Sequence, residues 1–171
     1  MSYIGVKFHP DTLSLLDKYI IKNNIPNPIP KKFLRATLLC SDPELDNFKT
    51  GQLELDYFGI PKRLYKVETG DGTISLVLEF ISVQLSERHE ELVKKYSVFH
   101  KFGEYNPHIT LSYDIGDLEL DLLSDIKVDI PYIRMDMEYY DKLDINWKRK
   151  FYREDSKENL LKLLEEKGKM L

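Results

Sequence analysis

One arrangement of predicted elements occurs twice in this sequence, once in each half: a strand, then a helix, then a strand that carries Thr-Leu. The first copy contains Arg-Ala-Thr-Leu at residues 35–38, and the second contains His-Ile-Thr-Leu at residues 108–111. Outside this recurrent order the two halves show no repeated sequence. Mixed strands and helices, together with a hairpin in the middle of the chain, favour an α+β fold with antiparallel sheets.

Hydrophobic periodicity places the helices and strands. Leu13, Leu16 and Ile20 recur at helical spacing and predict a helix over residues 11–22. Prolines at positions 26, 28 and 30 end it and force an extended connection. Further helices are expected at residues 84–98 and 156–171. Strands are expected at residues 3–8, 33–40, 64–67, 74–81, 109–113, 126–130 and 133–139.

The middle of the chain contains a predicted turn and a stretch that is harder to interpret. Thr-Gly-Asp-Gly at residues 69–72 suits a tight hairpin, because Asp and Gly tolerate positive φ. Residues 44–62 alternate in part, but Gly51, Gly59 and Pro61 interrupt the pattern. We therefore expect short strands and loops there.

Composition narrows the class of protein. Apolar residues make up 42% of the 171-residue chain and charged residues 32%, as in a globular domain. The net charge of −4 excludes the general basic field of a protein that coats long nucleic acid, although a local pocket for a small phosphorylated ligand stays compatible with it. Cys40 is the single cysteine, which indicates a reducing cytoplasm. The sequence contains no secretory signal, and no apolar stretch approaches the roughly 20 residues of a membrane span.

The segment Asn-Pro-His-Ile-Thr-Leu at residues 106–111 is the most informative motif. Residues two apart in a strand point to the same face, so His108 and Thr110 should project together while Ile109 and Leu111 turn into apolar packing. An imidazole can move a proton near neutral pH, and a hydroxyl beside it can bind a phosphate oxygen. The spacing also fits a partly buried histidine next to an ordinary strand threonine.

Residues 105–111 resemble the second motif of the 2H phosphoesterases, a superfamily that includes RNA ligase T-like enzymes. Residues 30–38 occupy the place of the first motif, and residues 4–8 with Asn27-Pro28 resemble phage members that hydrolyse cyclic oligonucleotide signals of bacterial CBASS immunity. The resemblance implies two pseudo-symmetric lobes over residues 1–154, with a histidine strand from each lobe facing a shared cleft. It also implies chemistry without a metal or cofactor. The predicted helix at 155–171 lies outside the resemblance, and we expect it to pack on this domain or on a partner.

The first motif departs from the family pattern, because Arg35 stands where a histidine is expected. Arginine stays charged and cannot accept a proton, but its planar donors can bind a phosphate oxygen. Thr37 should share the face of Arg35. Three interpretations are open: a substitution in an active lineage, a protein that binds its ligand without cleaving it, or an accidental match with Arg35 on the surface.

Other residues are candidates for ligand contact. His100 precedes the second motif, Tyr3 and Tyr105 are candidates for stacking on bases, and Trp147 lies in a basic and aromatic segment that also suits an anchor for the last helix. Glu138 is a candidate acceptor from a base edge or a solvated carboxylate. Of the remaining histidines, His9 is expected to cap a helix and His89 to pack or lie on the surface.

The resemblance to the 2H phosphoesterases thus implies metal-independent cleavage of a phosphodiester bond in a small cyclic oligonucleotide. Catalysis is assigned to His108, Thr110, Thr37 and Arg35. Alternatives are a module that sequesters the same ligand, an enzyme acting on RNA 2′,3′-cyclic phosphate ends, and a structural protein with a relic site. An acidic patch at residues 114–121 is expected to be a solvated loop rather than a cation site.

Overall fold

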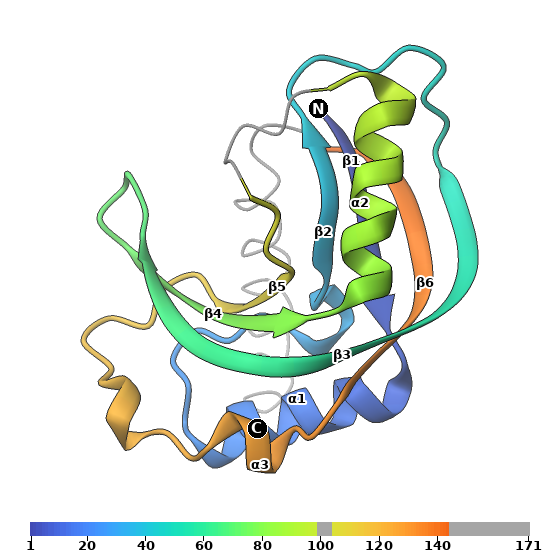
Figure 1. The fold of residues 1–171 in the computed structure, drawn as a ribbon. Helices are drawn as coiled ribbons and strands as arrows, with labels where there is room; N and C mark the ends of the chain where they lie inside the picture. Colours follow the sequence, from blue (N-terminus) through green and yellow to red (C-terminus); the bar gives the residue numbers. More distant parts are fainter. Residues whose placement is uncertain (99–103, 144–171) are drawn as a thin grey trace, which may run out of the picture.

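Six antiparallel strands form one closed sheet in the computed structural model, which describes residues 1–98 and 104–143. The order around the sheet is β1-β2-β5-β4-β3-β6. The strands are β1 (Ser2–Phe8), β2 (Ala36–Ser41), β3 (Gly51–Glu68), β4 (Ile74–Ile81), β5 (His108–Ser112) and β6 (Ile133–Lys142). The helices are α1 (Pro10–Lys22), α2 (Val83–Tyr96) and α3 (Ile126–Asp129), with 3-10 turns η1 (Lys31–Phe33) and η2 (Leu120–Leu122). Figure 1 shows α1 and α3 together below the sheet and the long β3 curving along its side.

The strand β1 lies between β2 and β6, and its side chains alternate between the two faces of the sheet. Ile4, Val6 and Phe8 are buried in the hydrophobic core. The alternate residues Tyr3, Gly5 and Lys7 point to the opposite face because side chains alternate along a strand. One face of β1 thus stabilises the fold and the other is available for a site.

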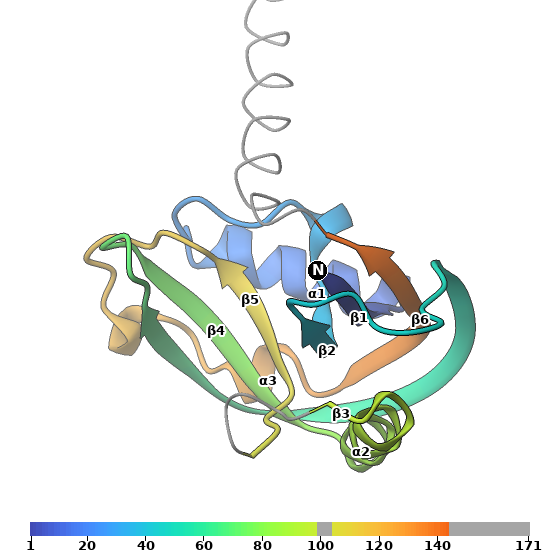
Figure 2. The ribbon, with the colours of Figure 1, turned by 90° about the horizontal axis from the view of Figure 1, so that it is seen from above.

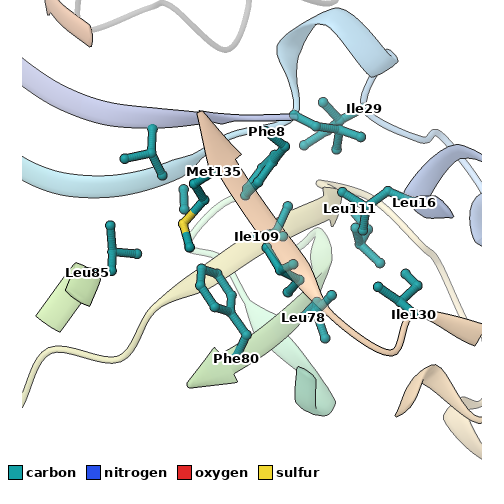
Figure 3. Close-up of a cluster of buried hydrophobic side chains, with 14 of the residues drawn as sticks. Phe8, Leu16, Ile29, Leu78, Phe80, Leu85, Ile109, Leu111, Ile130 and Met135 are labelled. Carbon is teal, nitrogen blue, oxygen red and sulfur yellow. The ribbon is translucent and has the colours of Figure 1, made fainter. Parts of the chain in front are cut away.

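The hydrophobic core connects the helices to the sheet. Figure 3 shows Ile109 of β5 among Leu78, Phe80 and Met135, and Leu111 of the same strand beside Leu16. Ile109 and Leu111 are fully buried, as predicted from the alternation of the second motif. Their burial fixes which way the intervening Thr110 points.

Both long helices begin at residues that cap them. The Nδ1 atom of His9 accepts a hydrogen bond from the backbone N–H of Asp11 at 3.1 Å, which confirms the predicted capping role of this histidine. The hydroxyl of Ser82 accepts from the backbone N–H of Leu85 at the start of α2. The end of α2 is marked by Ser97 in the left-handed region at φ 51°.

The central strand β3 differs from the expected short strands and loops. It is a single 18-residue strand that pairs with both β4 and β6. Pro61 is accommodated because the pairing with β4 shifts register between Pro61 and Arg63, and an irregularity tolerates a missing N–H. The predicted hairpin between β3 and β4 is confirmed, with Gly72 at φ 85°.

The prediction of a strand over residues 126–130 is wrong, because Ile126–Asp129 form the helix α3 and Ile130 directly follows it. Ile126 and Ile130 are buried while Val128 is 73% exposed, which is the pattern of a helical turn and not of strand alternation. The Asp125 carboxylate caps this helix by accepting from the backbone N–H of Lys127.

The first motif strand begins later than expected, at Ala36, since Lys31–Phe33 form a 3-10 turn. The α+β class and the antiparallel pairing are confirmed. The division into two pseudo-symmetric lobes and the domain limit at 154 stay predictions, and the expected helix at 155–171 lies outside the described residues. Within the described ranges, no helix combines the length and apolar character of a membrane span.

Candidate functional site

The two motif strands meet at one pair of residues. Ala36 of β2 and Ile109 of β5 are the Cα partners of this antiparallel contact, and Figure 2 shows the two strands in the centre of the fold. Both side chains are buried, so their neighbours in each strand point to the opposite face. In this register Thr37 is opposite His108 and Arg35 is opposite Thr110. The pairing of β2 with β5 therefore brings the four residues that are predicted to be catalytic onto one surface.

This surface is the floor of a pocket of about 730 Å³. Three cationic residues on different elements line it: Lys7 of β1, Lys32 of η1, and Arg35 just before β2. Among the described residues that line it, Asp141 is the single carboxylate. The other lining residues are Tyr3, Ile29, Phe33, Leu34, Thr37, Gly51, Gln52, His108, Thr110, Tyr113, Tyr139, Tyr140 and Leu143. The pocket is thus locally positive and rich in aromatic rings, although the chain carries a net charge of −4.

The His108 imidazole is held in one orientation. Its Nδ1 atom lies 2.9 Å from the backbone carbonyl oxygen of Asn106, and a carbonyl can only accept, so Nδ1 carries the proton and donates. In the neutral ring the Nε2 atom then keeps its lone pair. The Cα partner of His108 on β4 is Glu79, whose buried carboxylate is bonded to the Arg63 guanidinium at 2.6 Å.

The Arg35 guanidinium lies within a group of tyrosines. Its Nη1 atom donates to the Tyr139 hydroxyl at 3.1 Å, and its Cζ atom lies 4.5 Å from the centre of the Tyr3 ring. Burial by itself would lower the pKa of Arg35, but the neighbouring Tyr3 and Tyr139 outweigh it and the pKa is raised. Arg35 is therefore a fixed, permanently charged donor, and it is not a surface residue unrelated to the site.

The Thr37 hydroxyl is also fixed. It lies 3.0 Å from the Tyr3 hydroxyl, and Gly5 lies between Thr37 on β2 and Tyr139 on β6 in the sheet register. The pKa values of Tyr3 and Tyr139 are both raised, chiefly by burial, so both phenols keep their protons.

Tyr105 lies behind the strand that carries Thr37 and does not line the pocket. Its hydroxyl donates to the backbone carbonyl of Thr37 at 2.7 Å, and its ring stacks on His89 at 4.0 Å between centroids. The Nδ1 atom of His89 donates to the backbone carbonyl of Leu38 at 2.6 Å. The expected packing role of His89 is confirmed, while the stacking of Tyr105 on a base stays a prediction that this position does not favour.

Glu138 also lies away from the pocket. Its fully buried carboxylate accepts from Arg88 of α2 at 2.7 and 2.9 Å and from the Tyr140 hydroxyl at 2.7 Å. The expected contact of Glu138 with a base edge, or with solvent, is not what this geometry provides, because the carboxylate is used to join α2 to β6. His100 and Trp147 lie outside the described residues.

Sequence reasoning missed several residues that line the pocket. Tyr139 and Lys7 are the clearest, since the ring of Tyr139 lies 5.0 Å from Lys7 Nζ and its hydroxyl contacts Arg35. The alternation of β6 places Tyr139 on the face opposite the buried Glu138, but which face of β6 meets the site depends on its pairing with β1. Lys7 was missed because an exposed lysine near the end of a strand has no sequence pattern that distinguishes it from other surface lysines.

The fold and the site together define an α+β protein with a cationic, aromatic pocket that suits a phosphorylated ligand. Residues 1–150 match the family of the anti-CBASS protein Acb1, and the chain belongs to this family. Curated relatives with that name include those of Salmonella phage S16 and Enterobacteria phage T4, each 32% identical over 146 residues that cover 85% of this chain and 90% of the relative. The relative from Acinetobacter phage Ac42 is 29% identical over 154 residues, with 86% of this chain and 93% of the relative covered.

Proposed function

We propose that this protein hydrolyses a phosphodiester bond in a small cyclic oligonucleotide signal and so acts against CBASS immunity in the host cell. The observation that carries this proposal is the pocket in which His108 and Thr110 of β5 meet Thr37 of β2 and Arg35 just before that strand. The relatives' name supplies the biological setting, and the motif resemblance to 2H phosphoesterases supplies the reaction type.

In this proposal each of the four residues has the role that its side-chain chemistry allows. Thr37 and Thr110 donate hydrogen bonds to the non-bridging oxygens of the scissile phosphate, and Arg35 offsets the charge that develops there. His108 takes the proton of the attacking water through Nε2 as the new P–O bond forms, since its Nδ1–H is engaged by Asn106. The imidazolium returns that proton to the leaving oxygen as the scissile P–O bond breaks. Every step uses side chains of the chain itself, and turnover is expected to persist in EDTA.

Arg35 limits the rate in this scheme. The family mechanism needs one group that takes a proton from the attacking oxygen and another that protonates the leaving oxygen, and Arg35 cannot do the first. Loss of one general acid–base partner costs about 10²–10⁴ in rate. The protein is therefore a slow enzyme with an intact phosphate site.

A cyclic oligonucleotide fits the composition of the pocket. Lys7 and Lys32 add positive charge beyond Arg35, which suits a ligand with more than one phosphate. Aromatic side chains, Phe33 and Tyr113 among them, line the same pocket, and stacking of a base on an aromatic ring is worth about 1–3 kcal/mol. A volume of about 730 Å³ lies within the usual range of small-molecule sites.

The test compares two variants on a panel of cyclic di- and trinucleotides, with a 2′,3′-cyclic-ended RNA as a further substrate. Arg35→His is expected to raise single-turnover cleavage by about 10²–10⁴, and His108→Ala to abolish it while ligand still binds. Products are followed by chromatography. Cleavage that neither variant changes would contradict the proposal, and cleavage of the RNA end alone would replace the substrate class.

A second candidate function is sequestration of the same ligand without cleavage. It is favoured by the way Tyr3 and Tyr139 fix Arg35, which leaves the site a binder of phosphate with a single imidazole among its described residues. Tight binding by calorimetry, with no product from the wild-type protein and rapid product from Arg35→His, would establish this function.

A further inference from the structure

We infer that Tyr105 and His89 are positioning residues, which hold a bulge in β2 and thereby fix where the Thr37 hydroxyl lies relative to β5. This inference rests on the proposed function, because it concerns how the reacting groups of that site are held. Both residues act from behind β2, since neither is among the described residues that line the pocket.

The bulge in β2 lies directly after Thr37. In the pairing with β1, Thr37 has Gly5 as its Cα partner. Leu39 is the partner of Ile4, the neighbouring residue of β1, and Leu38 has no partner in that register. Leu38 and Leu39 are consecutive and both lie in the hydrophobic core, which departs from regular alternation. Such an extra residue bends a strand and redirects its side chains, so the orientation of Thr37 depends on what holds the bulge.

The side of β2 that faces β5 has few partners from strands. Among the described residues, the two strands share one pair of Cα partners, Ala36 with Ile109, and β5 itself begins at His108. Buried carbonyl groups without a donor destabilise a fold. Side chains therefore have to supply donors where the strand pairing stops.

Two side chains supply donors to consecutive carbonyl groups at the bulge. The Tyr105 hydroxyl donates to the backbone carbonyl of Thr37 at 2.7 Å. The Nδ1 atom of His89 lies 2.6 Å from the carbonyl oxygen of Leu38, and it is the donor because a carbonyl oxygen can only accept. The rings of His89 and Tyr105 are stacked, with centroids 4.0 Å apart and planes 9° from parallel. The two donors therefore support one another and act as one unit.

This unit is anchored in α2. His89 lies in the middle of that helix and is only 4% exposed, and α2 runs alongside β2 (Figure 1). Because His89 is buried, water does not compete for its hydrogen bond. Burial also raises the pKa of the Tyr105 phenol, so the hydroxyl keeps the proton that it donates.

Tyr105 also connects the bulge to the second motif. It precedes His108 by three residues, and the carbonyl oxygen of the intervening Asn106 accepts from His108 Nδ1 at 2.9 Å. The carbonyl oxygen of Pro107 accepts from the backbone N–H of Phe80 on β4 at 3.0 Å. The Asn106 carbonyl that orients the imidazole thus lies between an attachment to β2 through Tyr105 and an attachment to β4 through Pro107. Loss of the Tyr105 hydroxyl should loosen the imidazole as well as the bulge.

The experiment compares Tyr105→Phe with Tyr19→Phe as a matched control. Each variant loses a hydroxyl that donates to a backbone carbonyl at 2.7 Å between segments far apart in the chain. The Tyr19 hydroxyl donates to Ser124, and neither of these two residues lines the pocket. Both variants should therefore lose similar thermal stability, and only Tyr105→Phe should disturb the site.

The readouts are single-turnover cleavage of cyclic di-AMP and of a cyclic triadenylate, and the affinity for each by calorimetry. Tyr105→Phe should cleave about tenfold more slowly, because the hydroxyl and the imidazole no longer meet at one phosphate. Its affinity should change less than about threefold, since every group that contacts the ligand is still present. Tyr19→Phe should change neither quantity. Equal losses in both variants, or an unchanged rate in Tyr105→Phe, overturn the inference.

A double-mutant cycle tests whether the two residues act together. His89→Phe keeps a ring against Tyr105 but loses the donor to Leu38, and it should also slow cleavage. The combined variant His89→Phe with Tyr105→Phe should lose less than the product of the two single losses, because both changes loosen one bulge. Single losses that multiply overturn the joint role.

A second arm needs neither ligand nor cleavage. In protein isotopically labelled at the histidine ring nitrogens, at alkaline pH where imidazole is neutral, His108 should show mainly the tautomer with its proton on Nδ1. Tyr19→Phe should look the same. In Tyr105→Phe the Nδ1 and Nε2 resonances should move towards each other, because the ring then samples both tautomers. Resonances of His108 that stay as in wild type overturn the inference. If they move as expected in a protein that cleaves no cyclic oligonucleotide, the hydrolytic function fails and the positioning role stands.

Discussion

A glycine at position 5 sets the shape of the pocket floor. The Tyr3 ring lies across the position where a side chain would project, and it reaches Thr37 and supports the Arg35 guanidinium from there. The glycine is required by the lack of space beside Tyr3 and Tyr139, where β1 lies between the two flanking strands β2 and β6, and not by an unusual backbone angle. Any larger residue must move Tyr3 away from both partners.

Gly5→Ala is therefore expected to weaken the binding of cyclic oligonucleotides at least tenfold and to cost about 1–3 kcal/mol of stability through overpacking. Calorimetry and urea unfolding measure the two effects. Gly70→Ala is the matched control, because a Cβ atom there would meet nothing within 4 Å. Retention of full affinity by Gly5→Ala would show that Tyr3 can leave its position without consequence for the site.

At the scale of elements, α2 is joined to β6 through a buried ion pair. Glu138 is fully buried and accepts two hydrogen bonds from Arg88, whose pKa is raised chiefly by this contact. Arg88 also bonds Glu91 at 2.9 Å and the Tyr140 hydroxyl at 3.1 Å. Since β6 carries Tyr139 next to Glu138, the ion pair fixes the back of the strand whose front contacts Arg35.

Removal of one partner should destabilise the protein strongly. Arg88→Met strands the Glu138 carboxylate in the interior and is expected to cost about 3–5 kcal/mol in urea unfolding. The double variant Arg88→Met with Glu138→Leu should recover much of that loss, because no charge is then left buried. A single-variant cost under about 1 kcal/mol would indicate that water reaches this carboxylate.

The same elements explain which parts of the fold could be predicted from the sequence. Periodicity located α1, α2, β4 and the motif strands because their own side chains determine which face is buried. It failed at residues 126–130, where strand and helix patterns look alike over so few positions and the Asp125 cap decides. It missed the length of β3 because a register shift beside Pro61 is a property of the pairing with β4, not of the β3 sequence.

The residues of the candidate site also fall into two groups: those that a local sequence pattern predicts, and those that only strand pairing brings together. The shared face of His108 and Thr110 could be predicted because their two-residue spacing lies within one strand. Thr37 comes to that face through the pairing of β2 with β5. Tyr139 and Lys7 join them only through the pairing of β1 with β6, which no local pattern encodes. Glu138 was misjudged for the opposite reason, because its partner Arg88 comes from a helix 50 residues away.

For the molecule as a whole, a closed sheet means that each strand pairing supports the others, and Glu79 lies where three strands meet. It pairs with Arg63 on β3 and with His108 on β5, and Arg63 and Lys62 both contact its carboxylate. Only 7% of its side chain is exposed. The hydrogen bond from Arg63 is the main reason that the pKa of Glu79 lies below its ordinary value.

This shift makes the stability of the fold sensitive to acid. A carboxyl group whose pKa is lowered by folding stabilises the native state above its unfolded pKa of about 4.3, and the contribution is lost as the pH falls through the lower folded-state value. Glu79→Gln should therefore have a lower urea midpoint than wild type at pH 7, and the difference should shrink below about pH 4.3 and vanish once Glu79 is protonated. Asp121→Asn, the same chemical change at an exposed position, should leave the midpoint unchanged at pH 7. A Glu79→Gln deficit that stays constant down to pH 2.5 would mean that the Gln side chain packs poorly and that the Glu79 charge contributes nothing to the closure of the sheet.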